Sequence, residues 1–307
     1  MTDVSVVKPA RRFLHICYCC HDVEPVTQFL LDGLGLKLVM RTPKEWGPGK
    51  ILGIDRDTYG ETTFVYDQRG ARVSPAIEVQ AWIDPPLEGT PSLDPLEAGV
   101  KAIGFSVRKI DDTVERLTGM GCTVAFRGRS PFGQVARLVD ATGVTVEVME
   151  NALLAADTAQ FRHLRITSTD LDVSLPFYDR LGFAVIERTS FTEGAWAGAP
   201  EAVEGEYVRL RLPDEPFEVQ LVQWNTPASH GRHYANPQHA GLFRMALGVD
   251  DTRAAYDQML SEGVVFDRPP MDVILNGTPV PEMWICFLSD PDGVPFEFVQ
   301  RPRAAFK

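Results

Sequence analysis

The hydrophobic and polar positions of this chain form short runs that are grouped in a repeating order. Residues 13–19 are almost wholly apolar, which predicts a strand. Residues 22–31 predict a short helix, because the segment opens on Asp22 and has Pro25 in its first turn. Further strands are predicted at 36–41, 62–66 and 76–82. The first unit is therefore expected to contain one strand, one helix and three strands.

The same order recurs along the rest of the chain. The second unit has predicted strands at 100–107, 123–126, 134–139 and 144–149 and a helix at 110–120. The third has strands at 161–167, 181–189 and 217–224 and a helix around 173–181. The fourth has a strand at 242–249, a helix at 251–262 and a closing strand that contains Glu297. The predicted unit boundaries are 10–84, 98–150, 161–226 and 240–302.

Two closing strands share one phrase, which indicates a duplication. Asp140-Ala-Thr-Gly-Val-Thr-Val-Glu147 and Asp290-Pro-Asp-Gly-Val-Pro-Phe-Glu297 carry Asp, Gly, Val and Glu at the same spacing, 150 residues apart. Asp and Gly favour a tight turn, and the final Glu is a carboxylate within an apolar strand. Each of these carboxylates is expected to have a partner.

The repeated order predicts an α+β fold with four βαβββ modules paired into two domains. A unit of about 70 residues cannot cover both faces of its own sheet, so it must pair with another. We expect the first half, residues 1–150, to hold the first two modules and the second half, residues 161–307, to hold the last two. Residues 151–160, which are rich in alanine and compatible with a helix, form the predicted linker. The pairing predicts a cleft in each half.

Composition narrows the class of protein. Hydrophobic residues at 44% and charged residues at 23% are typical of a soluble globular chain. The net charge of −12 argues against a surface that binds nucleic acid. No apolar run approaches the ~20 residues of a membrane helix, and the N-terminus lacks a signal pattern, so we expect a cytoplasmic protein. The odd count of five cysteines, with Cys17, Cys19 and Cys20 in one strand, favours reduced structural thiols.

These features resemble the vicinal oxygen chelate superfamily, which includes glyoxalase I, methylmalonyl-CoA epimerase, type I extradiol dioxygenases and the bleomycin and fosfomycin resistance proteins. The resemblance covers nearly the whole chain. Its elements are the two closing strands, the opening strands with His15 and His163, and the phrases Leu34-Gly35 and Leu181-Gly182. It implies that paired modules form a U-shaped, mixed-sheet cradle around a divalent metal, with ligands on the first and last strand of each module.

The ligand positions implied by the resemblance fall on two sets of residues. The first half offers His15, Glu78, Ala102 and Glu147, and the second offers His163, Gln220, Arg244 and Glu297. Both sets lack the second histidine that family enzymes usually have. The first half still implies a metal site of His15, Glu78 and Glu147, for which Zn, Ni, Fe, Mn and Mg all stay open. In the second, Arg244 facing Glu297 implies an ion pair beside His163 and Gln220, which would be structural or would hold a substrate carboxylate.

The resemblance implies a glyoxalase-type isomerase or lyase for a small oxygen-rich or aromatic substrate. The metal would act as a Lewis acid that stabilises an enolate, with Glu78 or Glu147 as the base. One alternative is a metal-free protein that binds a small molecule, as resistance proteins do. Another is an extradiol dioxygenase, which would need His230, His233 or His239 as an additional ligand. Each candidate residue has a purely structural explanation as well, and a homodimer through exposed sheet edges stays open.

Overall fold

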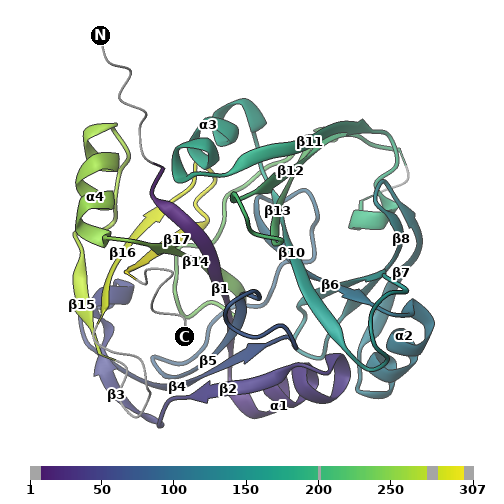
Figure 1. The fold of residues 1–307 in the computed structure, drawn as a ribbon, viewed down its shortest axis with the longest axis horizontal. Helices are drawn as coiled ribbons and strands as arrows, with labels where there is room; N and C mark the ends of the chain where they lie inside the picture. The colour runs from purple at the N-terminus through teal and green to yellow at the C-terminus, as the bar shows by residue number, and fades with distance from the viewer. Residues whose placement is uncertain (1–7, 200–201, 275–282, 301–307) are drawn as a thin grey trace.

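Two large curled sheets make up the core architecture (Figure 1). The computed structural model describes residues 8–199, 202–274 and 283–300. Expectations about the N-terminal segment 1–7 and the last residues of the fourth unit, 301–302, therefore lie outside the described residues. Within the described part, the predicted α+β class is confirmed, with four modules that each begin with a strand and a helix.

The elements follow the predicted order. Module 1 contains β1 (Ala10–Cys20), α1 (Val23–Gln28), β2 (Lys37–Arg41), β3 (Glu45–Pro48), β4 (Asp57–Tyr66) and β5 (Ala76–Asp84). Module 2 contains β6 (Gly99–Val107), α2 (Ile110–Gly119), β7 (Thr123–Ser130), β8 (Gly133–Val139) and β9 (Thr145–Glu150). Module 3 contains β10 (Ala159–Thr167), α3 (Leu171–Leu181), β11 (Ala184–Phe191), β12 (Glu204–Arg211) and β13 (Glu218–Thr226). Module 4 contains β14 (Gly241–Val249), α4 (Thr252–Ser261), β15 (Met271–Val273), β16 (Met283–Ser289) and β17 (Pro295–Gln300).

Three short helical segments complete the description. A π-helical turn at Phe29–Gly33 extends α1, and two 3₁₀ turns lie at Gly49–Leu52 and Ala195–Ala197. The helices begin where the sequence predicts, because Asp22, Asp170 and Asp251 each cap a helix by accepting a backbone N–H bond. The linker contains turns where a helix was allowed, and β10 already begins at Ala159.

The modules do not pair as predicted. One sheet has the order β15-β16-β17-β14-β1-β5-β4-β2 and joins module 1 to module 4; we call it the 1–4 sheet. The other has the order β11-β12-β13-β10-β6-β9-β8-β7 and joins module 2 to module 3; we call it the 2–3 sheet. The expected pairing of modules 1 with 2 and 3 with 4 is therefore wrong. The division at 151–160 stays a prediction about the sequence repeat, and both sheets cross it.

The connections between modules explain this pairing. The short connection from β9 to β10 keeps modules 2 and 3 in one sheet, where β10 runs antiparallel to β6. The two longer links, residues 85–98 and 227–240, cross between the sheets and are hydrogen-bonded to each other. Every module can pair through the edge of its first strand. The repeat pattern alone therefore does not predict which two modules share a sheet.

The core lies between the two sheets. Ile16 of β1, Ile103 of β6, Leu164 of β10 and Met245 of β14 are all fully buried in one hydrophobic cluster. Because strand side chains alternate, the neighbours of these residues project from the opposite, concave face of each sheet. Those concave faces form two cradles, one on each sheet, and they hold the candidate residues.

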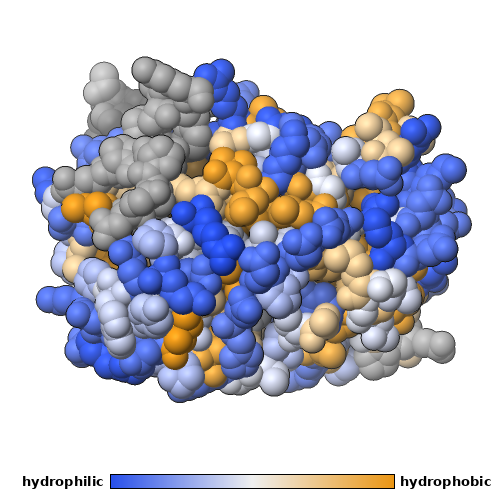
Figure 2. All heavy atoms as spheres, turned by 90° about the horizontal axis from the view of Figure 1, so that it is seen from below, coloured by the Kyte–Doolittle hydropathy of each residue, from blue (hydrophilic) through white to orange (hydrophobic). Residues whose placement is uncertain are grey.

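The surface carries both hydrophobic and hydrophilic side chains. Figure 2 shows a face on which hydrophobic patches are separated by hydrophilic side chains. Within the described residues, no helix is long and apolar enough to cross a membrane.

Candidate functional site

The 1–4 cradle brings together four of the eight residues that the resemblance singled out. His15 lies on β1, Glu78 on β5, Arg244 on β14 and Glu297 on β17. Two strand pairings set their positions: Glu78 lies opposite Cys17 across β1 and β5, and Glu297 lies opposite Ala246 across β14 and β17. Modules 1 and 4 thus contribute equivalent positions to one polar surface at the base of the 1–4 cradle. We call these four side chains the floor of the cradle.

Arg244 ties this floor together. Its Nη2 lies 3.1 and 3.0 Å from the two oxygens of Glu78, and its Nε donates to Glu297 Oε2 at 3.2 Å. Its Nη1 donates to Gln80 Oε1 at 3.1 Å and to Cys17 Sγ at 3.3 Å. All three nitrogens of the guanidinium are therefore hydrogen-bonded to the protein, and the cation is paired with two buried carboxylates.

His15 faces the same carboxylates from the other side. Its Nε2 lies 3.3 Å from Glu78 Oε2 and 3.6 Å from Glu297 Oε2. This nitrogen is buried but has no well-aligned hydrogen bond. Its ring packs edge-on against Phe64, with ring centroids 5.6 Å apart. The Nε2 of His15 therefore faces both carboxylates without a well-aligned hydrogen bond to either.

The pKa shifts follow from burial and charge. Burial alone would raise the pKa of Glu297, but His15 and Arg244 outweigh it and hold the pKa below its ordinary value. Burial acts to lower the pKa of Arg244, yet Cys17, Glu78 and Glu297 hold it above the usual arginine value. The thiol of Cys17 has a pKa well above its ordinary value, mainly because of burial. Glu297 and Arg244 are accordingly both charged at neutral pH.

A cavity of about 290 Å³ opens above this floor. Most of its walls are apolar, and the polar groups converge at the bottom. The apolar walls come from β1, β2, β4, β16 and the turn at Gly49–Leu52, with residues that include Leu14, Val39, Leu52, Phe64, Ile285 and Phe287.

The 2–3 cradle holds a second set of charged side chains, and these are buried beneath other residues. Glu147 of β9 lies 2.7 Å from Arg165 Nη2 and 3.0 Å from His163 Nε2, and these three side chains are almost fully buried. Burial alone would raise the pKa of Glu147, but the charge of Arg165 and the bond from His163 lower it to about 2. This cluster is a buried ion pair.

Aromatic side chains fill the space above that cluster. Trp196, Tyr207 and Trp224 form one hydrophobic cluster there, and Arg165 lies 5.7 Å from the centroid of the Trp196 ring. On β6, Gly104 leaves room for the His163 ring, since a Cβ at this position would lie 1.9 Å from a ring atom. We infer that the 2–3 cradle has a structural role.

The predicted grouping of site residues is therefore corrected. Glu147 does not lie with His15 and Glu78, because modules 1 and 2 belong to different sheets. Likewise, Gln220 shares the 2–3 sheet with His163 and Glu147, where its Nε2 lies 3.4 Å from Glu218 Oε2, and Ala102 lies opposite Arg165. The predicted ion pair between Arg244 and Glu297 is present, but with Glu78 and His15 as neighbours.

Sequence reasoning missed three polar partners. Gln80 and Cys17 lie two residues from Glu78 and His15, on the same strand faces, and Arg165 lies two residues from His163. Residues two positions apart in a strand lie on the same face, so this spacing could have identified the three partners from the sequence.

The loop histidines do not complete the 1–4 cradle. His230 is exposed and lies 3.3 Å from Asp94, and none of His230, His233 and His239 lines the large cavity. His233 is buried. In the described part of the chain, no group of three or more His, Cys, Asp or Glu residues is arranged to hold a metal ion.

Removal of the Glu147 carboxylate should destabilise the fold. Glu147→Ala leaves Arg165 buried without its counter-charge, so we expect a loss of about 3–5 kcal/mol in the free energy of unfolding by urea. The exposed Glu115→Ala should change it by less than about 0.5 kcal/mol. Because the folded pKa of Glu147 is lowered to about 2, its contribution is complete above the unfolded pKa and is lost as the pH falls toward about 2. Equal stability of the two variants would contradict the structural role.

Comparisons with known proteins agree with this architecture. The family model of the Glyoxalase/Bleomycin resistance protein/Dioxygenase superfamily matches residues 12–148 and 160–298. The chain is 24% identical over 214 residues to the lactoylglutathione lyase of Schizosaccharomyces pombe, which covers 66% of this chain and 67% of the relative. It superposes on glyoxalase I from Zea mays with a TM-score of 0.70 at 15% identity, covering 96% of this chain and 93% of that one. The chain belongs to the glyoxalase, bleomycin resistance protein and dioxygenase superfamily.

Proposed function

We propose that this chain binds a small, largely apolar molecule in the 1–4 cradle without the help of a divalent metal. The support is a cavity of about 290 Å³ with apolar walls and a few convergent polar groups at its base. The carboxylates of Glu78 and Glu297 outnumber the single guanidinium, so the floor suits a ligand that offers a hydrogen-bond donor. The Nε2 of His15, which has no well-aligned hydrogen bond, would be the second polar contact for the ligand.

The single observation that carries the metal-free proposal is the bonding of Arg244. The resemblance implies metal ligands on the first and last strand of each module, and the 1–4 sheet brings His15, Glu78, Arg244 and Glu297 of these strands together. Three of these are suitable donors, but the guanidinium is bonded to both carboxylates. Two unit charges about 4 Å apart interact by about 4 kcal/mol at an effective dielectric constant of about 20, and a divalent ion doubles this repulsion to about 8 kcal/mol. The residues present do not fit a metal unless Arg244 moves away.

Other functions of the superfamily receive different support. An extradiol dioxygenase would need two histidines and one carboxylate, and the 1–4 cradle has one histidine. The predicted cytoplasmic location and a homodimer stay predictions, as does a small-molecule substrate.

A proton-transfer isomerase or lyase is the second candidate, and the position of His15 favours it. An imidazole nitrogen without an aligned hydrogen bond lies beside two carboxylates at the base of an apolar cavity. An ionised Glu297 could accept a proton from a carbon next to a carbonyl group, while His15 donates a hydrogen bond to the carbonyl oxygen. The similarity to a lyase supports this class of reaction.

Replacement of Arg244 by histidine should create a metal site. The Arg244→His variant supplies the missing donor and removes the competing cation, so we expect it to bind one zinc ion at least about a hundredfold more tightly than the wild type. After treatment with EDTA, calorimetric titration with zinc measures the affinity, and metal-dependent thermal unfolding gives a second readout. Adding Glu297→Gln to Arg244→His should abolish the gain. Tight zinc binding by the wild-type chain that is lost in His15→Ala would contradict the metal-free proposal.

An apolar probe should report on the cavity itself. The neutral dye N-phenyl-1-naphthylamine carries one N–H donor, and we expect saturable binding with a rise in fluorescence. Val39→Trp narrows the cavity from the exposed strand β2 and should weaken binding at least about tenfold. Ile186→Trp, at the equivalent position of module 3, is the matched control and should leave the affinity unchanged. Binding that is the same in both variants would place the dye outside the 1–4 cradle.

Hydrogen exchange tests the second candidate. With 2-hydroxyacetophenone in D₂O, the wild type should incorporate deuterium next to the carbonyl group, as measured by NMR. Glu297→Gln removes the base and should slow incorporation by about a hundredfold or more. Glu115→Gln, on the exposed face of α2, serves as the control. A wild-type rate equal to that of the solution without protein would reject the enzymatic candidate and leave the binding proposal standing.

A further inference from the structure

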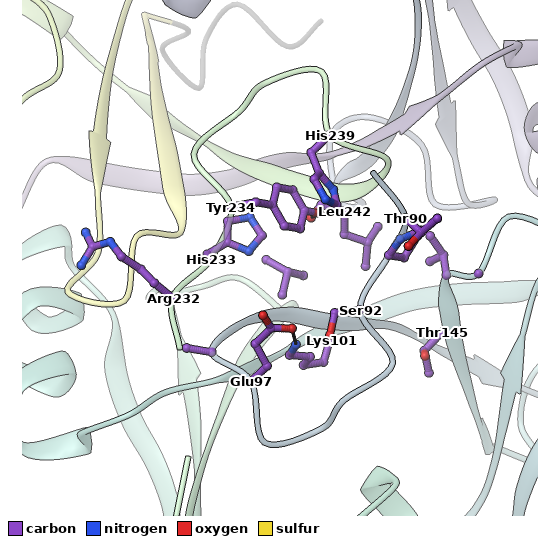
Figure 3. A pocket seen from close by; sticks show the side chains of 15 residues that line it. Thr90, Ser92, Glu97, Lys101, Thr145, Arg232, His233, Tyr234, His239 and Leu242 are labelled. Atoms are coloured by element: carbon purple, nitrogen blue, oxygen red, sulfur yellow. Dashed lines mark hydrogen bonds and ion pairs between the residues drawn. The ribbon is translucent and has the colours of Figure 1, made fainter. Parts of the chain in front are cut away.

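A second cavity, of about 190 Å³, lies where the two sheets meet (Figure 3). Its walls are the links 85–98 and 227–240, the start of β6 and the turn before β9. The links are held together by backbone bonds from Glu88 N to Gln238 O at 2.9 Å, from Ala240 N to Glu88 O at 2.8 Å and from Ala98 N to His230 O at 2.8 Å. The cavity shares no lining residue with the 1–4 cradle.

Lys101 is the buried charged group of this cavity. Its side chain is 6% exposed, and its Nζ lies 3.8 Å from Glu97 Oε2, which is longer than a hydrogen bond. Within the described residues, no hydrogen bond to this amine is found. Figure 3 shows Lys101, Glu97 and Ser92 on one wall and His233, Tyr234 and His239 on the opposite wall.

The surroundings favour a neutral amine. Burial lowers the pKa of Lys101 to about 8, with Arg165 acting in the same direction and Glu97 and Asp94 opposing it. At pH 7 about one such amine in ten is unprotonated, against about one in a few thousand for an ordinary lysine. The amine is therefore a far better nucleophile than a surface lysine.

On the opposite wall, His233 does not supply a competing charge. Burial lowers the pKa of His233 to about 3, and its Nε2 lies 2.9 Å from the carbonyl oxygen of Phe243, so this ring is neutral. His239 Nδ1 lies 2.9 Å from the carbonyl oxygen of Ala240, and its ring stacks on Tyr234. Arg232 lines the edge and donates to the carbonyl oxygen of Pro291 at 3.1 Å.

We propose that Lys101 is the nucleophile of a second ligand site, which takes a small aldehyde or ketone as an imine. The amine nitrogen bonds to the carbonyl carbon, the resulting carbinolamine loses water, and a C=N bond replaces C=O. Glu97, 3.8 Å away, is placed to carry the proton that leaves nitrogen and to return it to the departing hydroxyl. The imine nitrogen then takes one proton from the solvent, and the resulting cation lies beside Glu97, whereas a carbamate would place a negative charge there. That difference selects carbonyl compounds over carbon dioxide.

Reductive labelling tests the proposal. The full chain is treated at pH 7 with limiting propanal and sodium cyanoborohydride, and peptide mass spectrometry measures the labelling rate of each lysine. Lys101 should be labelled at least about tenfold faster than Lys37 and Lys109, which are exposed. Its rate should rise with pH around a midpoint near 8.

Two variants separate reactivity from structure. Lys101→Arg keeps the charge and should lose only this site, with the labelling of Lys37 and Lys109 unchanged. Glu97→Gln removes a charge that raises the pKa of Lys101, so the midpoint should move to lower pH. Labelling of Lys101 no faster than that of Lys109, or a midpoint that Glu97→Gln does not move, would overturn the proposal. Neither outcome bears on the 1–4 cradle, because the two cavities share no residue.

Discussion

Arg244 is a permanent cation in a place where water is largely excluded, and its charge has to be balanced within the protein. Glu78 and Glu297 provide that balance, and they belong to the first and the last module. The arrangement exists only because β1 runs beside β14, which brings module 1 and module 4 into one sheet. The strand pairing and the floor of the 1–4 cradle are thus linked through one buried ion-pair network, on which the proposed ligand binding depends. Loss of either carboxylate would leave Arg244 paired with a single carboxylate at the base of an open cavity.

The two cradles use related networks for different ends. In the 2–3 cradle, Arg165 and His163 share Glu147, and Trp196 and Trp224 fill the space above them. In the 1–4 cradle, Arg244 is paired with both carboxylates, but the space above stays open and apolar. The two sheets share their core, so a closed cradle on one side can contribute stability while the other keeps an exposed cavity. In the described part of the chain, the buried charges of the 1–4 cradle thus lie below an open cavity, whereas those of the 2–3 cradle lie below aromatic side chains.

Much of the fold follows from the sequence, because alternation, helix caps and the repeated Asp-Gly-Val-Glu phrase are local signals. The candidate residues could also be found, since His15, Glu78, Arg244 and Glu297 each occupy the first or last strand of a module. Their grouping could not. Four modules with equivalent edges can pair in more than one way, and the choice depends on links 85–98 and 227–240, whose composition carries no such signal. Glu147 was predicted to bind a metal with His15 and Glu78. In the structure it lies on the 2–3 sheet, where it forms an ion pair with Arg165. Lys101 lacked a local signal too, because its cavity is built by segments distant in sequence.

The central claim is that Arg244 and Glu78 are energetically coupled in the folded protein. A double-mutant cycle with Arg244→Met, Glu78→Gln and the combined variant measures this coupling directly through the free energy of unfolding in urea. We predict a coupling of about 2–3 kcal/mol, because Arg244→Met leaves two buried carboxylates without their guanidinium, and this cost falls when Glu78 is neutral as well. Effects that add to within about 0.5 kcal/mol would show that the guanidinium is not held by the carboxylate, and the account of a metal-free cradle would fail.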